Sequence, residues 1–276
     1  MSGFVETDLR SNRDTIPRSM IHSLIGQGVK SVVIQGPYAS SFAMNAAYTV
    51  AKEYLEKDSI EGFSPVTYLV RRSIDFPLIC KEVWNHDENY KSRKKVVDLE
   101  LADENWDEQI LKLINIVHIR SIKDLLSFLL SLHSHHKRPR GALIVDNIEL
   151  FTMQTSENST FTNEDTQNII QILAILEDSG EILRKLGSHS LLVLATINSS
   201  LPSSLQGLVK NWYPCVLKIT NYTEIRPNDV ILANWKVETT WIVSLEEGEK
   251  NKKVHFSVVK AETGGDAKII WCIFNS

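Results

Sequence analysis

The chain has 276 residues, of which 43% are hydrophobic and 23% are charged, a balance typical of a globular protein with ample material for a core. Its formal net charge of −4 excludes a generally basic nucleic-acid-binding protein, so any site for a polyanion must be a local patch. Three widely spaced cysteines form no zinc or redox motif, which favours a reduced intracellular setting over a disulfide scaffold.

The first organised stretch predicts a strand, a tight turn and a long helix. Ser31–Ile34 is a short apolar run that suits a strand buried on both faces. Gly36 marks the turn, and Ser40 or Ser41 is positioned to cap the helix that follows. Small and apolar side chains then recur at helical spacing as far as Tyr54, which predicts a helix with one buried face.

The same stretch can be compared with the phosphate-binding loop pattern G-x-x-x-x-G-K-[ST]. Gly36 supplies the first glycine, but Ser41, Phe42 and Ala43 stand at the last three positions. Phe42 has no charge for the β and γ phosphates, and Ala43 has no oxygen for magnesium. An ordinary strand-to-helix corner explains the stretch as well as a degenerate loop does. Under either interpretation we expect no catalytic residue, no ATP hydrolysis and no bound cofactor.

Strands and helices then alternate as far as residue 219. Ser121, with Asp124 in the capping-box position, predicts the start of one helix, and Asn163–Leu186 predicts a longer one. Phe76–Trp84 predicts a short helix and Ser199–Leu205 a loop of small residues. Runs of β-forming residues predict five more strands, at Val66–Val70, Ile114–Ile119, Ala142–Val145, Leu191–Ala195 and Cys215–Ile219.

The pattern changes after Asn221, where no helix separates the predicted strands. Trp241–Leu245, Val254–Val258 and Ile269–Ile273 predict an antiparallel meander at one edge of the sheet. We therefore expect an α/β fold with a mostly parallel sheet, helices on both faces and this C-terminal meander. The expected organisation is a lead-in over residues 1–30 and one domain over 31–276, with a parallel core at 31–220 and antiparallel strands at 235–276.

Asp146 ends the apolar strand Ala142–Val145, which is the form of a Walker B segment. In a working ATPase that aspartate orients magnesium, although buried strands also end in aspartate for turn reasons. A catalytic carboxylate is expected where the strand after the first helix ends, and Arg71 and Arg72 stand there instead.

Three segments together resemble the RecA-like recombinase core of the eukaryotic strand-exchange recombinase and its paralogs: Val32–Pro37, Ala142–Asn147 and Leu191–Thr196. Within that family the chain is most similar to the small ATPase-like subunits of the Shu complex. The resemblance implies a RecA-like P-loop NTPase core, a SWIM-domain partner protein, contact with a strand-exchange recombinase or its paralogs, and a nuclear location. It implies a role in assembling or stabilising recombinase filaments on single-stranded DNA during homologous recombination.

Two other functions stay open from the sequence. One is a RecA-like scaffold subunit of an Elongator-type accessory ring that acts in tRNA modification. The other is a weak ATPase completed in trans by a partner's residues. The missing phosphate and magnesium ligands at Phe42 and Ala43 favour a binding role over the weak ATPase.

Basic clusters are the candidate DNA contacts, because phosphate contacts dominate DNA affinity. We expect weak, salt-sensitive binding carried by the first two clusters, with an ordinary solvated surface as the alternative for each. The clusters are Arg71 and Arg72, then Lys91, Arg93, Lys94 and Lys95, and finally Lys137, Arg138 and Arg140.

Histidines and tryptophans gather in two places. His133, His135 and His136 predict a polar helix end rather than a metal site. Trp235, Trp241 and Trp271 lie in the meander and predict core or interface positions. With a free edge on the meander, they predict an obligate partner.

Overall fold

The computed structural model describes residues 29–56, 65–71, 80–84, 107–134, 138–152, 162–198, 203–213, 215–221, 235–245, 252–261 and 268–273. The expected lead-in therefore lies almost wholly outside the described residues, and so do Arg72, Lys137 and the cluster from Lys91 to Lys95.

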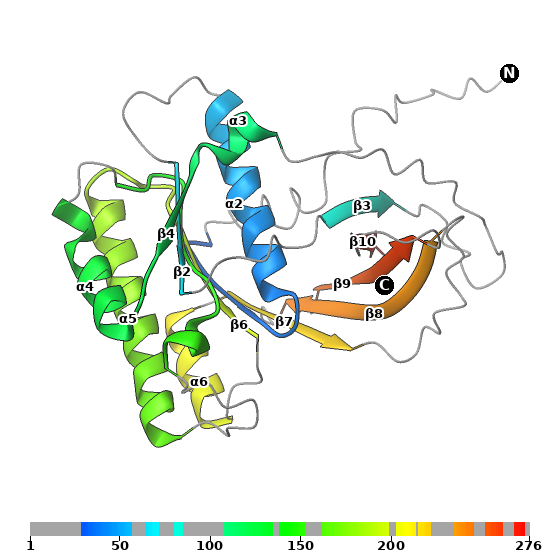
Figure 1. Cartoon of the computed structure of the whole chain (residues 1–276). Coiled ribbons are helices and arrows are strands. Elements are labelled where there is room, and N and C mark those ends of the chain that lie inside the picture. Colours follow the sequence, from blue (N-terminus) through cyan, green and yellow to red (C-terminus); the bar gives the residue numbers. More distant parts are fainter. Residues whose placement is uncertain are drawn as a thin grey trace, which may run out of the picture.

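The described strands form one ten-stranded sheet in the order β3-β10-β9-β8-β7-β1-β6-β5-β2-β4 (Figure 1). Six neighbouring strands are parallel, and an antiparallel run continues from β7, as predicted for the meander. The parallel strands are β1 (Ser31–Gln35), β2 (Val66–Val70), β4 (Ile114–His118), β5 (Ala142–Val145), β6 (Leu192–Ile197) and β7 (Cys215–Asn221). The others are β3 (Cys80–Trp84), β8 (Trp235–Leu245), β9 (Lys252–Ala261) and β10 (Lys268–Ile273).

Helices cover both faces of the parallel part (Figure 1). One face carries α2 (Ala39–Glu56) and the short α3 (Glu108–Leu111). The other carries α4 (Ile122–Ser131), α5 (Asn163–Lys185) and α6 (Ser203–Trp212). Two short 3-10 helices, η1 (Leu132–Ser134) and η2 (Ile148–Phe151), complete the described elements. This layering confirms the predicted α/β fold.

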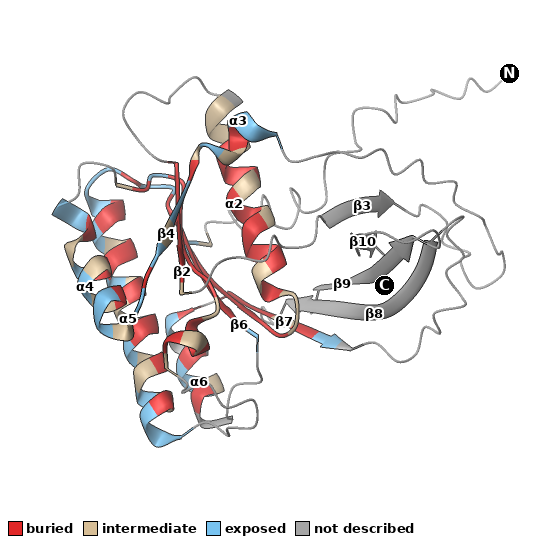
Figure 2. Cartoon of the chain, viewed as in Figure 1, coloured by how far each residue is buried: buried red, intermediate tan, exposed pale blue. Residues whose placement is uncertain are grey.

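Successive side chains along each strand alternate between the two faces of the sheet, which divides the core into two layers. In β1, Val32 and Ile34 belong to the core under α2, whereas Val33 belongs to the core under α4, α5 and α6. Successive side chains of a strand point to opposite faces, so a strand covered on both sides must be apolar throughout. Figure 2 shows the result: the central strands are buried, α2 is buried or half-buried along its described length, and α4 and α5 are exposed on their outer sides.

Two sequence-based assignments are wrong. Cys80–Trp84 is a strand and not part of a helix, because it pairs in parallel with β10 from Cys80↔Ile269 to Trp84↔Ile273. Non-local pairing here overrides the local pattern of the predicted helix. The meander's last strand is consequently paired, and among the described strands β3 and β4 stand at the two ends of the sheet. The predicted loop at Ser199–Leu205 gives way to α6, which begins at Ser203.

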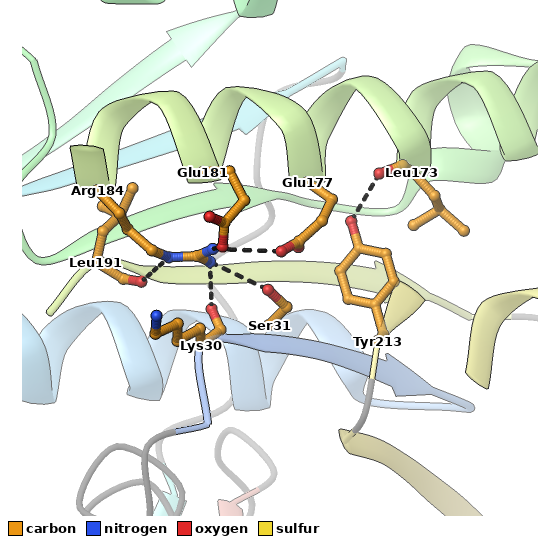
Figure 3. Close-up of polar contacts among 8 residues, drawn as sticks. All are labelled: Lys30, Ser31, Leu173, Glu177, Glu181, Arg184, Leu191 and Tyr213. Carbon is orange, nitrogen blue, oxygen red and sulfur yellow. Dashed lines mark hydrogen bonds and ion pairs between the residues drawn. The ribbon is translucent and has the colours of Figure 1, made fainter. Parts of the chain in front are cut away.

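A buried arginine ties the amino-terminal edge of the sheet together (Figure 3). Arg184, near the end of α5, is 4% exposed. Its guanidinium donates to the carbonyl oxygens of Lys30 at 2.9 Å and Leu191 at 3.2 Å, immediately before β1 and β6. It also donates to Glu181 at 2.6 Å and Glu177 at 3.3 Å on its own helix. The helix dipole favours a cation in the last turn of a helix, which is usually exposed to solvent. Arg184 is instead buried and links the helix to the chain before β1 and β6.

Candidate functional site

The candidate site is the corner between β1 and α2, at the carboxyl edge of the parallel sheet. Gly36 has a φ of 118° and donates its N–H to the carbonyl of Ile197 at 2.7 Å. A Cβ atom at this position would lie 2.5 Å from the backbone oxygen of Ile219. Gly36 therefore lets β1 turn between β6 and β7, which explains this glycine by packing alone.

The helix begins earlier than the sequence pattern predicts. Ala39 donates its N–H to the Gly36 carbonyl at 3.2 Å, and Ser41 donates to the carbonyl of Tyr38 at 2.9 Å. Ser40 and Ser41 consequently lie in the first turn and are not caps. In a phosphate-binding loop the backbone N–H groups of this stretch point at the ligand. The N–H groups of Ala39 and Ser41 are already used by neighbouring carbonyls.

Two of the positions that would bind phosphate and magnesium lie in the core. Phe42 is 6% exposed, and Ala43 is fully buried under the α2 face of the sheet. Ser41 is also buried, and its carbonyl accepts a hydrogen bond from the Asn45 side chain at 2.8 Å. Residues 41–44 are thus all buried, so the first turns of α2 pack into the core on every side.

Hydroxyl groups from three elements converge on the Walker B-like aspartate. Asp146, directly after β5, accepts a hydrogen bond from the Thr196 hydroxyl of β6 at 2.6 Å. Ser40 in α2 and Tyr68 in β2 also lie within hydrogen-bonding reach of this carboxylate, and the Tyr68 hydroxyl donates to the Ser40 carbonyl at 3.4 Å. Thr196 in turn accepts from the backbone N–H of Asn147 at 2.6 Å. The carboxylate that would orient magnesium in a working ATPase is here paired with protein hydroxyls.

Burial sets the protonation of this cluster. It raises the pKa of the Asp146 carboxyl, although hydrogen bonds from Thr196, Ser40 and Tyr68 oppose the shift. Burial, together with the nearby Asp146 charge, also raises the pKa of Tyr68 well above its usual value. Tyr68 therefore keeps its proton and remains a donor.

Comparison with known proteins identifies the architecture. No protein-family model matches the chain, and no curated protein matches it in sequence. Among solved structures, the flagellar accessory protein FlaH from Methanocaldococcus jannaschii aligns with 94% of this chain and 97% of its own, at 13% identity and a TM-score of 0.50. The chain has a RecA-like fold.

Two further structures are similar at lower scores. A KaiC-like protein from Pyrococcus horikoshii aligns with 88% of this chain and 89% of its own, at 16% identity and a TM-score of 0.49. A DnaB-like replicative helicase aligns with 90% of this chain but 59% of its own, at 14% identity and a TM-score of 0.43. At these identities the likeness is one of architecture alone.

Sequence reasoning missed a second carboxylate at the same edge of the RecA-like sheet. Glu149 in η2 is buried, and both of its oxygens accept the backbone N–H of Asn198 at 3.0 Å. This bond ties the end of β6 to η2. Asn147 between the two carboxylates adopts a left-handed conformation with φ 51°. The spacing of Asp146 and Glu149 was the available signal, but only the strand order shows that Asn198 lies within reach.

The predicted DNA-contact residues separate in the RecA-like fold. Arg71 follows β2 at the carboxyl edge and is half-buried, whereas Arg138 and Arg140 precede β5 at the opposite edge. His133 is exposed in η1, and among the described residues no group of histidine, cysteine and acidic side chains could hold a metal ion. Nor is any described helix long and apolar enough to cross a membrane.

Proposed function

We propose that this chain is a non-catalytic RecA-like subunit that supports recombinase filaments in homologous recombination, acting by binding and not by turnover. The observation that carries the proposal is the Asp146 cluster. The carboxylate that ATPases use for magnesium here accepts the Thr196 hydroxyl, with Ser40 and Tyr68 within hydrogen-bonding reach. The buried Phe42 and Ala43 support it further, since neither offers a phosphate or magnesium ligand.

The proposed partners follow from the resemblance and from the fold. A RecA-like domain that lacks its own ATP chemistry keeps its surfaces for other proteins, and we propose a SWIM-domain protein and a strand-exchange recombinase or its paralogs. Exposed apolar side chains on α6 support an interface there: Leu208 and Trp212 lie one turn apart, with 42% and 36% of their surfaces exposed. Tryptophan is enriched at the energetic centres of interfaces.

The first prediction concerns nucleotide. We expect calorimetric titration of the full chain with ATP and magnesium to give no saturable binding in the micromolar range, because the phosphate and metal ligands are absent at Phe42 and Ala43. A RecA-like ATPase measured under the same conditions is the positive control. Saturable micromolar binding would contradict the non-catalytic assignment.

The second prediction separates a structural Asp146 from a catalytic one. Asp146→Asn keeps the size of the side chain and an acceptor for Thr196, so we expect partner binding to survive within about twofold, well under 1 kcal/mol. Asp146→Leu, which removes every acceptor for the surrounding hydroxyls, should lower stability by about 1–3 kcal/mol. Loss of function in a folded Asp146→Asn variant would favour the ATPase alternative.

The Asp146→Asn variant also has a pH signature. A carboxyl whose pKa is raised in the folded state stabilises the fold fully below its unfolded pKa of about 3.9, and this contribution is lost as pH rises through the folded pKa. Asparagine mimics the protonated carboxyl at every pH. The melting temperature of the variant relative to wild type should therefore increase between acidic and neutral pH, and a flat difference would contradict the burial argument.

The third prediction concerns assembly. We expect the chain expressed alone to self-associate in sedimentation runs at several concentrations, and co-expression with a SWIM-domain protein to give a soluble complex. Leu208→Ser combined with Trp212→Ser should weaken that complex, while Leu186→Ser, at a more exposed residue after α5, should not. A stable monomer that captures no recombination protein would exclude this role.

A further inference from the structure

Three cationic side chains and a histidine lie where β2 and β4 end. The two strands are parallel neighbours in which Val70 lies opposite His118, and the Ile119 N–H donates to the Val70 carbonyl at 2.8 Å. Arg71 therefore leaves β2 level with Ile119, and Arg120 follows one residue later at the same carboxyl edge of the sheet. Lys123 follows in the first turn of α4. We call Arg71, His118, Arg120 and Lys123 the β2–β4 patch.

The side chains of this patch reach solvent in the part of the chain that the structure describes. His118, Arg120 and Lys123 are exposed and Arg71 is half-buried. Within the described part of the chain, none of the four side chains forms a hydrogen bond or an ion pair. Lysine and arginine side chains placed this way attract phosphates, and open α/β sheets bind ligands beyond the carboxyl ends of their strands.

Of the described carboxylates near the patch, Asp124 is exposed and accepts the Ser121 hydroxyl at 2.8 Å, whereas Asp146 and Glu149 are buried and bonded inward. The three cations of the patch therefore outnumber its one exposed carboxylate, although the whole chain carries a formal charge of −4. A local positive field on an acidic protein concentrates polyanions at that site.

The neighbouring surface of β4 suits unpaired bases. Ile116 is 42% exposed and lies two residues before His118, so both side chains project from the same face of the edge strand. An exposed aliphatic group and a planar ring next to a row of cations can pack against bases while the cations hold the phosphates. Bases stacked inside a duplex cannot reach such a surface.

We propose that the β2–β4 patch binds single-stranded nucleic acid, with Arg71, Arg120 and Lys123 on the phosphates and His118 and Ile116 against the bases. The cations come from separate elements and do not enclose a pocket. This arrangement suits successive phosphates along a nucleic-acid chain better than a single phosphate group. The inference deepens the proposed function and rests on it for the class of ligand, because it assigns the nucleic-acid contact of a filament-supporting subunit.

The test measures binding of a labelled oligothymidine to the full chain by fluorescence anisotropy across a salt series. The variant Arg71→Gln/Arg120→Gln/Lys123→Gln should bind roughly tenfold or more weakly, and its log–log salt slope should be about 2 units shallower, at about 0.7 per lost phosphate contact. The matched control Lys112→Gln/Arg138→Gln/Lys185→Gln removes the same charge from the opposite edge and should change affinity less than twofold.

A variant of the proposed base contact completes the test, together with two comparison ligands, a DNA duplex and polyglutamate. His118→Ala should weaken binding to oligothymidine with little change in salt slope, and should leave duplex binding unchanged. Equal losses in the two triple variants would overturn the proposal, and so would stronger binding of polyglutamate than of oligothymidine. If the chain binds oligothymidine through the patch but does not affect recombinase filaments, the proposed function is contradicted and the patch is not. If the chain supports filaments without binding oligothymidine, the patch is contradicted and the proposed function is not.

Discussion

Arg184→Met is expected to destabilise the protein by about 3 kcal/mol, the lower end of the cost of breaking a buried ion pair, because the carboxylates left behind are 20% and 45% exposed. The substitution keeps most of the aliphatic stem but deletes the guanidinium that bonds five groups (Figure 3). The carbonyls of Lys30 and Leu191 then lose their side-chain donor. Glu177 would lose its cation, although one of its oxygens already lacks a hydrogen-bond partner.

Thermal unfolding is the measurement, and neighbouring residues supply the controls. Lys185→Met changes the next residue, which is exposed, and should alter stability by less than about 0.5 kcal/mol. Adding Glu177→Leu to Arg184→Met should recover part of the loss, because an apolar pair leaves no half-buried carboxylate without its cation. A melting temperature for Arg184→Met within the error of wild type would show that the clamp contributes nothing.

The Arg184 clamp also shows where sequence reasoning ends. A cation in the last turn of α5 is predictable from the helix dipole, and so is the helix itself, which runs from Asn163 to Lys185. What the pattern cannot show is that Lys30 and Leu191 come within reach. That contact depends on β1 lying next to β6, a pairing between segments more than 150 residues apart.

The fold was predictable wherever the local signal and the tertiary environment agree. The parallel strands are apolar runs of β-forming residues, and their observed bounds match the predicted ones within one or two residues. In the two elements that were assigned wrongly, β3 and α6, the local signal and the tertiary environment disagree. Lys81 and Glu82 give β3 a polar centre, so only its pairing with β10 makes it a strand. The polar start of α6 resembles a loop until Leu205 and Val209 are seen to pack on the core.

The candidate site was predictable only in part for the same reason. Asp146 stands out because it ends an apolar strand, and Gly36 because it ends another. The hydroxyls around Asp146 carry no sequence signal, since serine, threonine and tyrosine are common in strands and helix starts. They meet because β5 lies between β2 and β6, with Ile144 opposite both Tyr68 and Leu194.

Gly36→Ala is expected to be the second strongly destabilising change, by about 3 kcal/mol or more. Two costs combine: a φ of 118° strains an L-residue by about 1–2 kcal/mol, and the new Cβ would lie 2.5 Å from the Ile219 backbone oxygen. Overpacking of this kind adds about 1–3 kcal/mol when the neighbour is backbone that has to shift. The displaced atoms belong to β7, so the substitution also disturbs the strand that leads into the meander.

Two other glycines separate these costs. Gly187 has a φ of 110° but nothing within 4 Å of an added Cβ, so Gly187→Ala reports backbone strain alone, about 1–2 kcal/mol. Gly207 lies inside α6 with open space around it, and Gly207→Ala should stabilise by up to about 1 kcal/mol. Chemical denaturation of the three variants gives the order directly. If Gly36→Ala costs no more than Gly187→Ala, the contact between the corner and Ile219 is not a constraint, and Gly36 would then need a reason outside packing, such as the close approach of a ligand.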